Sequence, residues 1–425
     1  MIRSRSNKVL IITYYWPPAG GPGVQRVLKF AKYLPKFGWE PIILTVKNGE
    51  YPVIDESLEK DIPKCNVYKT KTKDLFRFYK KLTGKKTDEN IPTHLIAENS
   101  KESFANFIRL NLVIPDARKG WISTIVEEGT KIIKQHHPKF IFASSPPHSV
   151  QVGAAKLAKK NHLRLISDYR DPWLEIVYYQ NQKRSQLTEY FDAKLEKETM
   201  NAAYKVVTIS KELQKTIQKK VDDENKVKII PNGFDKEDFI NIRIKRNTTF
   251  TITYAGVIND ERIPFSLLNA MVNLLNQGQQ IKLQFFGKVC SKLSSLVSKK
   301  NLEDCVEYNN FVAHDLAIKE MMNSQLLLFV IDDVPQNKGF LTGKLFDYLG
   351  CMRPILGIGP VDGNAANLLD ETDSGKMFDY DDDSEVEEFL KESIADWRHN
   401  KDRFTFESQD YTRENLTKKL IEEFR

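Results

Sequence analysis

Short runs of apolar and β-branched residues alternate with amphipathic stretches along most of this 425-residue chain. Such alternation predicts parallel strands with helices packed on both faces of the sheet. The first repeat is the clearest one: residues 9–13 predict a strand, a glycine-rich loop follows, and residues 41–46 predict the next strand. A helix between them is predicted by apolar residues at helical spacing, which are Val24, Val27, Leu28, Ala31 and Leu34.

The same pattern continues on both sides of a polar run at residues 236–247, which predicts a linker between two domains. Residues from about 50 to 120 fit the alternation poorly, and we interpret them as an insertion. We therefore expect an α/β fold of two doubly wound, Rossmann-like domains facing each other across a cleft, the first over residues 1–240 and the second over residues 248–400. The remaining strands are predicted at residues 140–143, 163–167, 206–209, 227–230, 250–254, 282–286, 326–331 and 354–358.

Composition and charge fit two packed domains and exclude some classes of protein. Hydrophobic residues make up 41% of the chain, and its length suits two cores better than one. Lys and Arg total 64 against 57 Asp and Glu, and this modest excess gives no signal for nucleic acid. The apolar run near the N-terminus is too short for a secretion signal or a membrane span. We expect a reducing cytoplasm and no structural metal site, because the cysteines are widely scattered, at Cys65, Cys290, Cys305 and Cys351.

One segment suggests contact with a membrane. Residues 69–86, KTKTKDLFRFYKKLTGKK, combine eight basic residues and one acid with aromatic and aliphatic side chains. Mixtures of this kind suit an anionic membrane surface. An equally good interpretation is a solvated surface loop whose apolar residues pack against one another.

The second domain offers a candidate site for a diphosphate in the loop at residues 339–345, which follows a buried strand and opens a helix. Lys344 falls in the first turn of that helix, where the dipole disfavours a cation, and a bound diphosphate would resolve the conflict. Arg262 is a second cation that could offset charge on a departing nucleoside diphosphate, so that no metal is required. Asp347, one turn beyond Lys344, could accept hydrogen bonds from ribose hydroxyls. The simpler interpretations are a lysine that bends into solvent and an acid stabilised by the dipole.

In the first domain, two unusual segments directly follow predicted strands and therefore belong to one edge of the sheet. SSPPHS places His148 at a helix start, and SDYRDPW gathers Asp168, Arg170 and Asp171 beside Trp173. We regard His148 and Asp171 as catalytic candidates. The structural alternatives are a hydrogen-bonding histidine at a helix start and an internal network between Arg170 and Asp171.

The glycines of the first loop could let a ligand approach the backbone at a helix start, where free N–H groups attract anions. Their spacing does not match the dinucleotide-binding motif, which weakens a dehydrogenase interpretation. A tight turn that needs glycine is the alternative at each position, Gly20, Gly21 and Gly23.

With these segments in place, the chain resembles the family 4 glycosyltransferases of the GT-B fold, and within them a bacterial polysaccharide-synthesis branch. The likeness runs from Lys8 to about Tyr380, and the order of the motifs makes it specific. The matching segments are ITYYWPPAGGPGVQR, VIPDARKGW, SSPPHS, SDYRDPW, VVTISKEL, IIPNGFD, TYAGVINDERIPFSLLNA and GKLFDYLGCMRPIL.

The resemblance implies transfer of a sugar from a nucleotide diphosphate donor, with retention of anomeric configuration and without an essential metal. It implies a donor on the second domain and a glycan or lipid-linked acceptor on the first, in cell-surface polysaccharide synthesis. A C-terminal helix within residues 401–425 is expected to cross back to the first domain. The expected location is cytoplasmic, and peripheral contact with the inner membrane is a hypothesis.

The resemblance also assigns roles to single residues. Lys344 and Arg262 match phosphate-binding cations, and Asp347 matches the second acid of a spaced pair, which contacts ribose. Gly339 stands where the family has the first glutamate, and Val257 replaces the first basic residue of the loop that contains Arg262. The predicted donor-binding residues are Gly21, Gly256, Phe311, Val312, Leu341, Thr342, Gly343, Lys344 and Asp347.

Two other functions stay open. A nucleotide-sugar epimerase would share the fold and convert the donor alone, although SSPPHS and SDYRDPW argue against it. A degenerate member that binds nucleotide sugar or scaffolds other transferases is suggested by Val257 and Gly339.

Overall fold

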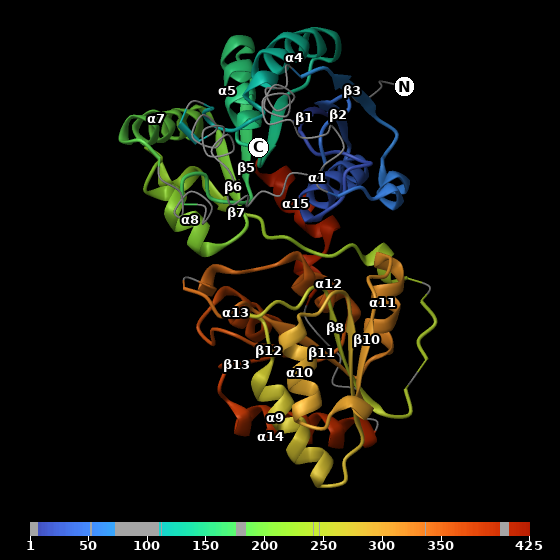
Figure 1. Ribbon diagram of the computed structural model, residues 1–425. Coiled ribbons are helices and arrows are strands. Elements are labelled where there is room, and N and C mark those ends of the chain that lie inside the picture. Colours follow the sequence, from blue (N-terminus) through green and yellow to red (C-terminus); the bar gives the residue numbers. More distant parts are fainter. Residues whose placement is uncertain are drawn as a thin grey trace. The chain divides into compact units, whose positions relative to one another are not determined.

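A computed structural model of the chain divides it into two compact units, Met1–Pro231 with Leu416–Arg425 and Asn232–Asn415. Each unit is an α/β structure around one parallel sheet, which confirms the predicted fold class (Figure 1). The structure describes residues 7–51, 53–72, 110–111, 113–175, 184–240, 242–245, 247–335, 337–399 and 408–425.

The sheet of the first unit has seven strands in the order β3-β2-β1-β4-β5-β6-β7, and all neighbouring strands are parallel. Its strands are β1 (Asn7–Ile12), β2 (Trp39–Val46), β3 (Asn66–Thr70), β4 (Phe140–Ser145), β5 (Arg164–Tyr169), β6 (Lys205–Thr208) and β7 (Val227–Ile229). Its helices are α1 (Pro22–Tyr33), α4 (Ile122–His136), α5 (Ser149–Asn161), α7 (Gln186–Ala202) and α8 (Lys211–Gln218). The helix α15 (Arg413–Glu422) also belongs to this unit from Leu416 onward.

Apolar side chains cover both faces of this sheet because successive residues of a strand point to opposite sides. In β1, Leu10 and Ile12 pack in the cluster that contains residues of α4 and α5. Val9 and Ile11 pack on the other face, with residues of α1 and with the end of α15. Because both faces of β1 are buried, its sequence is a nearly continuous apolar run.

The sheet of the second unit has six parallel strands in the order β10-β9-β8-β11-β12-β13. Its strands are β8 (Phe250–Ala255), β9 (Ile281–Phe286), β10 (Val306–Asn309), β11 (Leu326–Val330), β12 (Ile355–Ile358) and β13 (Gly375–Phe378). Its helices are α9 (Phe265–Asn276), α10 (Ser291–Lys299), α11 (His314–Asn323), α12 (Gly343–Cys351), α13 (Asn364–Thr372) and α14 (Asp383–Arg398). Alternate residues of β11 again enter two apolar clusters, one on each face.

Three strands were not predicted: β3, β10 and β13. Each lies at an edge of its sheet or is short, and their sequences NVYKT, VEYN and GKMF lack a continuous apolar run. β3 falls inside the range interpreted as an insertion, and there the interpretation was wrong because residues 66–70 pair with β2.

The strand order reverses once in each sheet, between β1 and β4 and between β8 and β11. At such a reversal the loops beyond the carboxyl ends of the strands diverge and leave a crevice where ligands bind. These two points are therefore where we look for a site.

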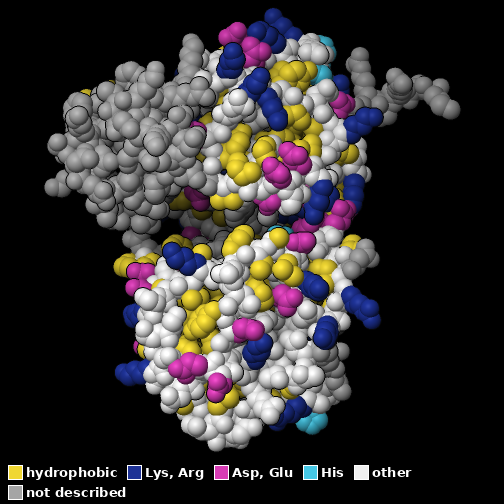
Figure 2. Space-filling model, turned by 45° about the vertical axis from the view of Figure 1, so that its right-hand side comes forward, with side chains coloured by type: hydrophobic (Ala, Val, Ile, Leu, Met, Phe, Trp, Pro, Cys, Tyr) yellow, Lys and Arg dark blue, Asp and Glu magenta, His cyan; other side chains and the backbone are white. Residues whose placement is uncertain are grey.

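The face drawn in Figure 2 has no large area of a single charge. Figure 2 shows basic and acidic side chains scattered over this face of both units, which fits the near balance of charge in the sequence. Within the described parts of the chain, no helix is long and apolar enough to cross a membrane. Of the basic segment at 69–86, the structure describes only residues 69–72, and the rest lies outside the described residues.

Candidate functional site

In the second unit, two predicted site residues meet at the end of β8. Gly256 follows this strand with a φ of 137°, in the region that favours glycine. A Cβ atom added at Gly256 would overlap Nζ of Lys344, which lies in the first turn of α12. The glycine therefore lets the ammonium group approach the backbone of the loop.

Lys344 is a half-buried cation, and its Nζ atom lies 4.0 Å from the ring centroid of Tyr254. Burial, helped by the charge of Arg262, lowers the pKa of Lys344 to about 7, although Asp332 acts in the opposite direction. Among the described residues no carboxylate forms an ion pair with Lys344. The first turn of α12 has no acidic residue and no side-chain cap. An uncompensated charge beside free N–H groups suits a bound anion.

Arg262, the second predicted cation, is already paired in this structure. Its Nη2 atom donates to Oδ2 of Asp332 at 2.6 Å, and Nη1 donates to the carbonyl oxygen of Val257 at 3.2 Å. Burial acts to lower the pKa of Arg262, but the bond to Asp332 and the neighbouring Tyr254 raise it on balance. Arg262 thus adds positive potential beside Lys344 while its own charge is partly neutralised.

Asp347 lies one turn further along α12 with a partly exposed carboxylate, 3.5 Å from Nε2 of His314. Phe311, in the loop after β10, has an 88% exposed ring, and the neighbouring Val312 is half-buried. An aromatic ring left in solvent is available to stack on a planar ligand. The loop that precedes α12 contains the last three predicted residues, of which Thr342 is exposed and Leu341 and Gly343 are half-buried.

Gly339, where the family resemblance implies a glutamate, leaves open space, since a Cβ atom there would meet no atom within 4 Å. Beside it lies a polar cavity of about 580 Å³ at the ends of β11, β12 and β13. The cavity is lined by Asp333, Val334, Pro335, Asn337, Lys338, Pro360, Val361, Asp362, Asp379 and Tyr380.

Replacing Gly256 by alanine is expected to destabilise the second unit by about 1–3 kcal/mol, because an L-residue is strained at this φ. The new methyl group also displaces the ammonium group of Lys344. Urea unfolding measures the change. Gly339→Ala is the matched control and should unfold like wild type, since its Cβ enters open space; equal stability of all three proteins would contradict this reading of Gly256.

In the first unit, His148 lies at the start of α5 and is only 7% exposed. Its ring stacks on Trp173 at a centroid distance of 4.7 Å and an interplanar angle of 9°. Burial lowers the pKa of His148 to about 3, with Arg170 adding to the effect, so the ring is neutral near pH 7. Nδ1 has no hydrogen-bond partner. A neutral ring can accept or donate a hydrogen bond but offers no charge to a substrate.

Of the structural alternative, a network between Arg170 and Asp171, the structure shows an electrostatic interaction but no hydrogen bond or ion pair between the two side chains. Arg170 instead donates to the carbonyl oxygens of Ser145 and Pro146, each at 3.1 Å. Asp171 has no hydrogen-bond partner among the described residues, and burial raises its pKa. Gly21 is the N-cap of α1 with a φ of 99° and open space at its Cβ position.

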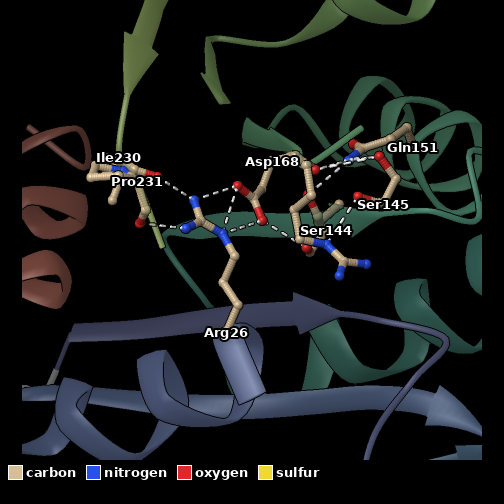
Figure 3. Close-up of polar contacts among 9 residues, drawn as sticks. Arg26, Ser144, Ser145, Gln151, Asp168, Ile230 and Pro231 are labelled. Atoms are coloured by element: carbon tan, nitrogen blue, oxygen red, sulfur yellow. Dashed lines mark hydrogen bonds and ion pairs between the residues drawn. The ribbon is translucent and has the colours of Figure 1, made fainter. Parts of the chain in front are cut away.

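Reasoning from the sequence missed Arg26, a fully buried cation at this edge. Figure 3 shows its side chain reaching from α1 between Asp168 and the chain at Ile230 and Pro231. It donates to Asp168 at 2.8 Å and to both carbonyl oxygens at 2.8 Å. Ser144 donates a further 2.6 Å bond to Asp168. A carboxylate at the end of a buried strand requires a cation, and that requirement was the available signal.

The predicted site residues therefore fall into two groups. Gly21, His148 and Asp171 belong to the first unit, at loops beyond the ends of β1, β4 and β5. The other predicted residues belong to the second unit, at loops beyond the ends of β8, β10 and β11. Three of these residues lie close together. Nζ of Lys344 lies over the ring of Tyr254 and against Gly256, and Arg262 donates to the carbonyl oxygen of Val257.

Comparison with known proteins gives a family match over part of the chain and a fold. Residues 87–238 match the family model described as Glycosyltransferase Family 4. No curated protein sequence matches the chain significantly. A glycosyltransferase from Rickettsia africae ESF-5 is similar over 99% of this chain and 98% of its own, at 12% identity and a TM-score of 0.61.

Two further solved structures cover nearly the whole chain. TarM is 11% identical over 99% of both chains, with a TM-score of 0.60, and a variant of TarM from S. aureus was solved with fondaparinux, α-GlcNAc-glycerol and UDP. A putative UDP-N-acetylglucosamine 2-epimerase from Listeria monocytogenes is 9% identical over 97% of this chain and 94% of its own, with a TM-score of 0.56. At such identities the likeness shows the fold alone. The chain therefore has the GT-B fold of these glycosyltransferase structures, and its residues 87–238 are similar to Glycosyltransferase Family 4, which supports a transferase enzyme.

Proposed function

We propose that the chain transfers a sugar from a nucleotide diphosphate donor to a glycan or lipid-linked acceptor, with retention of anomeric configuration and without an essential metal. The observation that carries this proposal is Lys344, a half-buried ammonium group at a helix start with no carboxylate partner among the described residues. Such a group needs an anion, and a diphosphate meets both the charge and the free N–H groups.

The chemistry follows from the charge that develops during transfer. As the bond between the sugar and the diphosphate breaks, negative charge grows on the departing phosphate. Lys344 and the start of α12 would stabilise that charge without rearranging, and Arg262 would add to the field. In this proposal, fixed positive groups of the protein replace the metal ion.

The other residues receive narrower roles in the same proposal. Asp347 would accept hydrogen bonds from ribose, and the exposed ring of Phe311 would stack on the base. His148 and Asp171 would lie toward the acceptor, where the neutral imidazole can only orient a hydroxyl group. The complex of TarM with UDP and a glycan supports a nucleotide donor and a carbohydrate acceptor for this fold.

The proposed setting is synthesis of a bacterial cell-surface polysaccharide on the cytoplasmic face of the inner membrane. The basic segment at residues 69–86 would provide the membrane contact. Pull-down by liposomes that contain anionic lipid, at low salt, tests this contact. Absence of binding would remove it from the proposal.

Donor turnover followed by proton NMR tests the proposed reaction and separates it from its rivals. Nucleoside diphosphate sugars of hexoses and N-acetylhexosamines are incubated with the protein and water alone. Slow release of free sugar with the donor's anomeric configuration is the result we expect. An intact donor with an inverted ring carbon would show an epimerase, and no change with any donor would favour a scaffold.

Donor binding is expected to weaken as pH rises above 7, because the anion binds the charged form of Lys344 and burial lowers its pKa to about 7. At pH 8 only about a tenth of the free protein would have the ammonium group charged, so affinity falls by up to about tenfold per pH unit. Titrations at pH 7, 8 and 8.5 measure this fall. The same titrations measure proton uptake, because the observed heat of binding then depends on the buffer.

Lys344→Ala is the control for that series, since its nucleotide affinity should not vary over the same range. A flat affinity for the wild-type protein from pH 7 to 8.5, without proton uptake, would contradict the assignment of the charge to Lys344.

A further inference from the structure

We propose that Asp332 is a further substrate-binding residue of the donor site, and that its carboxylate accepts a hydrogen bond from a hydroxyl group of the sugar to be transferred. This inference rests on the proposed function, because that proposal assigns the donor diphosphate to Lys344 and Arg262. It adds a contact to the sugar itself.

Asp332 lies just beyond the end of β11, beside the cations that would bind the diphosphate. Its Oδ2 atom accepts the 2.6 Å hydrogen bond from Nη2 of Arg262. Its charge also opposes the effect of burial on the pKa of Lys344. Because the strand order reverses between β8 and β11, this carboxylate lies where a ligand is expected.

One oxygen atom of this carboxylate is unsatisfied. Oδ1 of Asp332 is buried and has no hydrogen-bond partner among the described residues, although the side chain as a whole is 17% exposed. A buried carboxylate oxygen without a donor is costly. We therefore expect a ligand group that donates a hydrogen bond at this point when the site is filled.

The main chain holds Asp332 in place. Its carbonyl oxygen accepts hydrogen bonds from Nδ2 of Asn337 at 2.9 Å and from the hydroxyl group of Tyr380 at 3.1 Å. The next residue, Asp333, donates its backbone N–H to the carbonyl oxygen of Glu261 at 2.8 Å, which ties this loop to the loop after β8. A carboxylate held in this way need not rearrange to receive a ligand.

The chemistry of a nucleotide sugar leaves one class of group for this position. Phosphate oxygens are negatively charged, so a carboxylate repels them. The proposed function already assigns the ribose hydroxyl groups to Asp347. The sugar is bonded directly to the phosphate that Lys344 and Arg262 would bind, and its hydroxyl groups are hydrogen-bond donors. A sugar hydroxyl group can therefore satisfy Oδ1 of Asp332 without a repulsive contact.

The open space at Gly339 agrees with this assignment. The family resemblance implies a glutamate at this position, where the present chain offers no carboxylate. Asp332 supplies an acid from the start of the same loop, in contact with Arg262. Its neighbour Asp333 is exposed and lines the polar cavity.

Asp332→Asn tests the inference, because the amide keeps the shape of the side chain and an oxygen for Arg262 but cannot accept a second hydrogen bond at its nitrogen. Calorimetric titrations compare UDP-glucose, UDP-N-acetylglucosamine and GDP-mannose with UDP and GDP. The measured quantity is the ratio of the affinity for a nucleotide sugar to the affinity for its nucleoside diphosphate. Effects on the diphosphate alone, including a changed charge on Lys344, cancel in this ratio.

The ratio should fall at least about tenfold in Asp332→Asn, the effect of losing a charged hydrogen bond. Asp333→Asn is the matched control, since it removes the same charge from an exposed neighbour, and it should keep the wild-type ratio. Urea unfolding of both variants shows whether the second unit is intact.

A second measurement keeps the inference testable if Asp332→Asn fails to fold. Deoxy analogues of the nucleotide sugar that binds most tightly, each lacking a single hydroxyl group, are titrated into the wild-type protein. One analogue should bind at least about tenfold more weakly than its parent. In Asp332→Asn the same analogue should bind as its parent does, because the two changes remove one contact.

An unchanged ratio in Asp332→Asn would overturn the inference. In that case an equal loss for nucleotide sugar and nucleoside diphosphate would show that Asp332 only positions Arg262, and the proposed function would stand. Wild-type affinities that are the same for the parent and for every deoxy analogue would also overturn it. If none of these ligands binds the wild-type protein, the donor site is refuted, and this inference fails with it.

Discussion

Lys344→Ala is expected to weaken binding of nucleoside diphosphates by about 1.5–3 kcal/mol, or roughly 10- to 150-fold, and to leave nucleoside binding unchanged. The reason is that Lys344 has no carboxylate partner among the described residues and would meet only the phosphates. Calorimetry with a nucleoside diphosphate and the corresponding nucleoside measures both affinities. Turnover of the donor should fall at least as far, because charge on the leaving phosphate grows during the reaction.

Lys376→Ala provides a matched control in the same unit. Lys376 also lies over an aromatic ring, 5.0 Å from the centroid of Phe378, but it has a carboxylate partner in Glu385 at 2.7 Å. Its loss should change neither affinity. Equal losses for nucleoside and nucleoside diphosphate in Lys344→Ala would show a structural role for Lys344 and remove the phosphate contact from the proposal.

Arg26→Met is expected to destabilise the first unit by about 3–5 kcal/mol, the cost of leaving a buried carboxylate without its cation. The substitution keeps the apolar stem of the side chain but leaves Asp168 with Ser144 and frees the carbonyl oxygens of Ile230 and Pro231. Urea unfolding followed by tryptophan fluorescence measures the loss. Four of the five tryptophans report on the first unit: Trp16, Trp39, Trp121 and Trp173.

Lys131→Ala serves as the comparison, because Lys131 forms exposed ion pairs with Glu127 and Glu128 on α4. Its removal should leave the unfolding curve unchanged, as solvent screens such pairs. If Arg26→Met unfolds at the same urea concentration as Lys131→Ala, the pair between Arg26 and Asp168 does not stabilise the first unit.

The interior strands could be predicted from the sequence because they are buried on both faces. β1, β4, β8 and β11 are rich in apolar and β-branched residues, and they appear within one or two residues of their predicted bounds. The edge strand β3 has one neighbour and partly exposed side chains, so its sequence NVYKT alternates with polar residues. Hydrophobic patterning cannot distinguish such a strand from a loop.

The candidate site could be predicted less completely, for a related reason. Lys344 became a candidate because a cation at a helix start conflicts with the dipole, and the family resemblance then favoured a phosphate contact over a lysine in solvent. The pairing of Arg262 with Asp332 joins two strand ends that are 70 residues apart, and no local pattern reports it. The pairing of Arg26 with Asp168 could not be predicted for the same reason, since the two residues are 142 positions apart.

The donor site is tested by titrating the wild-type protein with uridine, guanosine, adenosine, cytidine and thymidine diphosphates, each beside its nucleoside. We expect at least one diphosphate to bind, to bind more tightly than its nucleoside, and to lose affinity above pH 7 as Lys344 loses its charge. Failure of every diphosphate to bind the folded protein would contradict the donor site, and with it the proposed function.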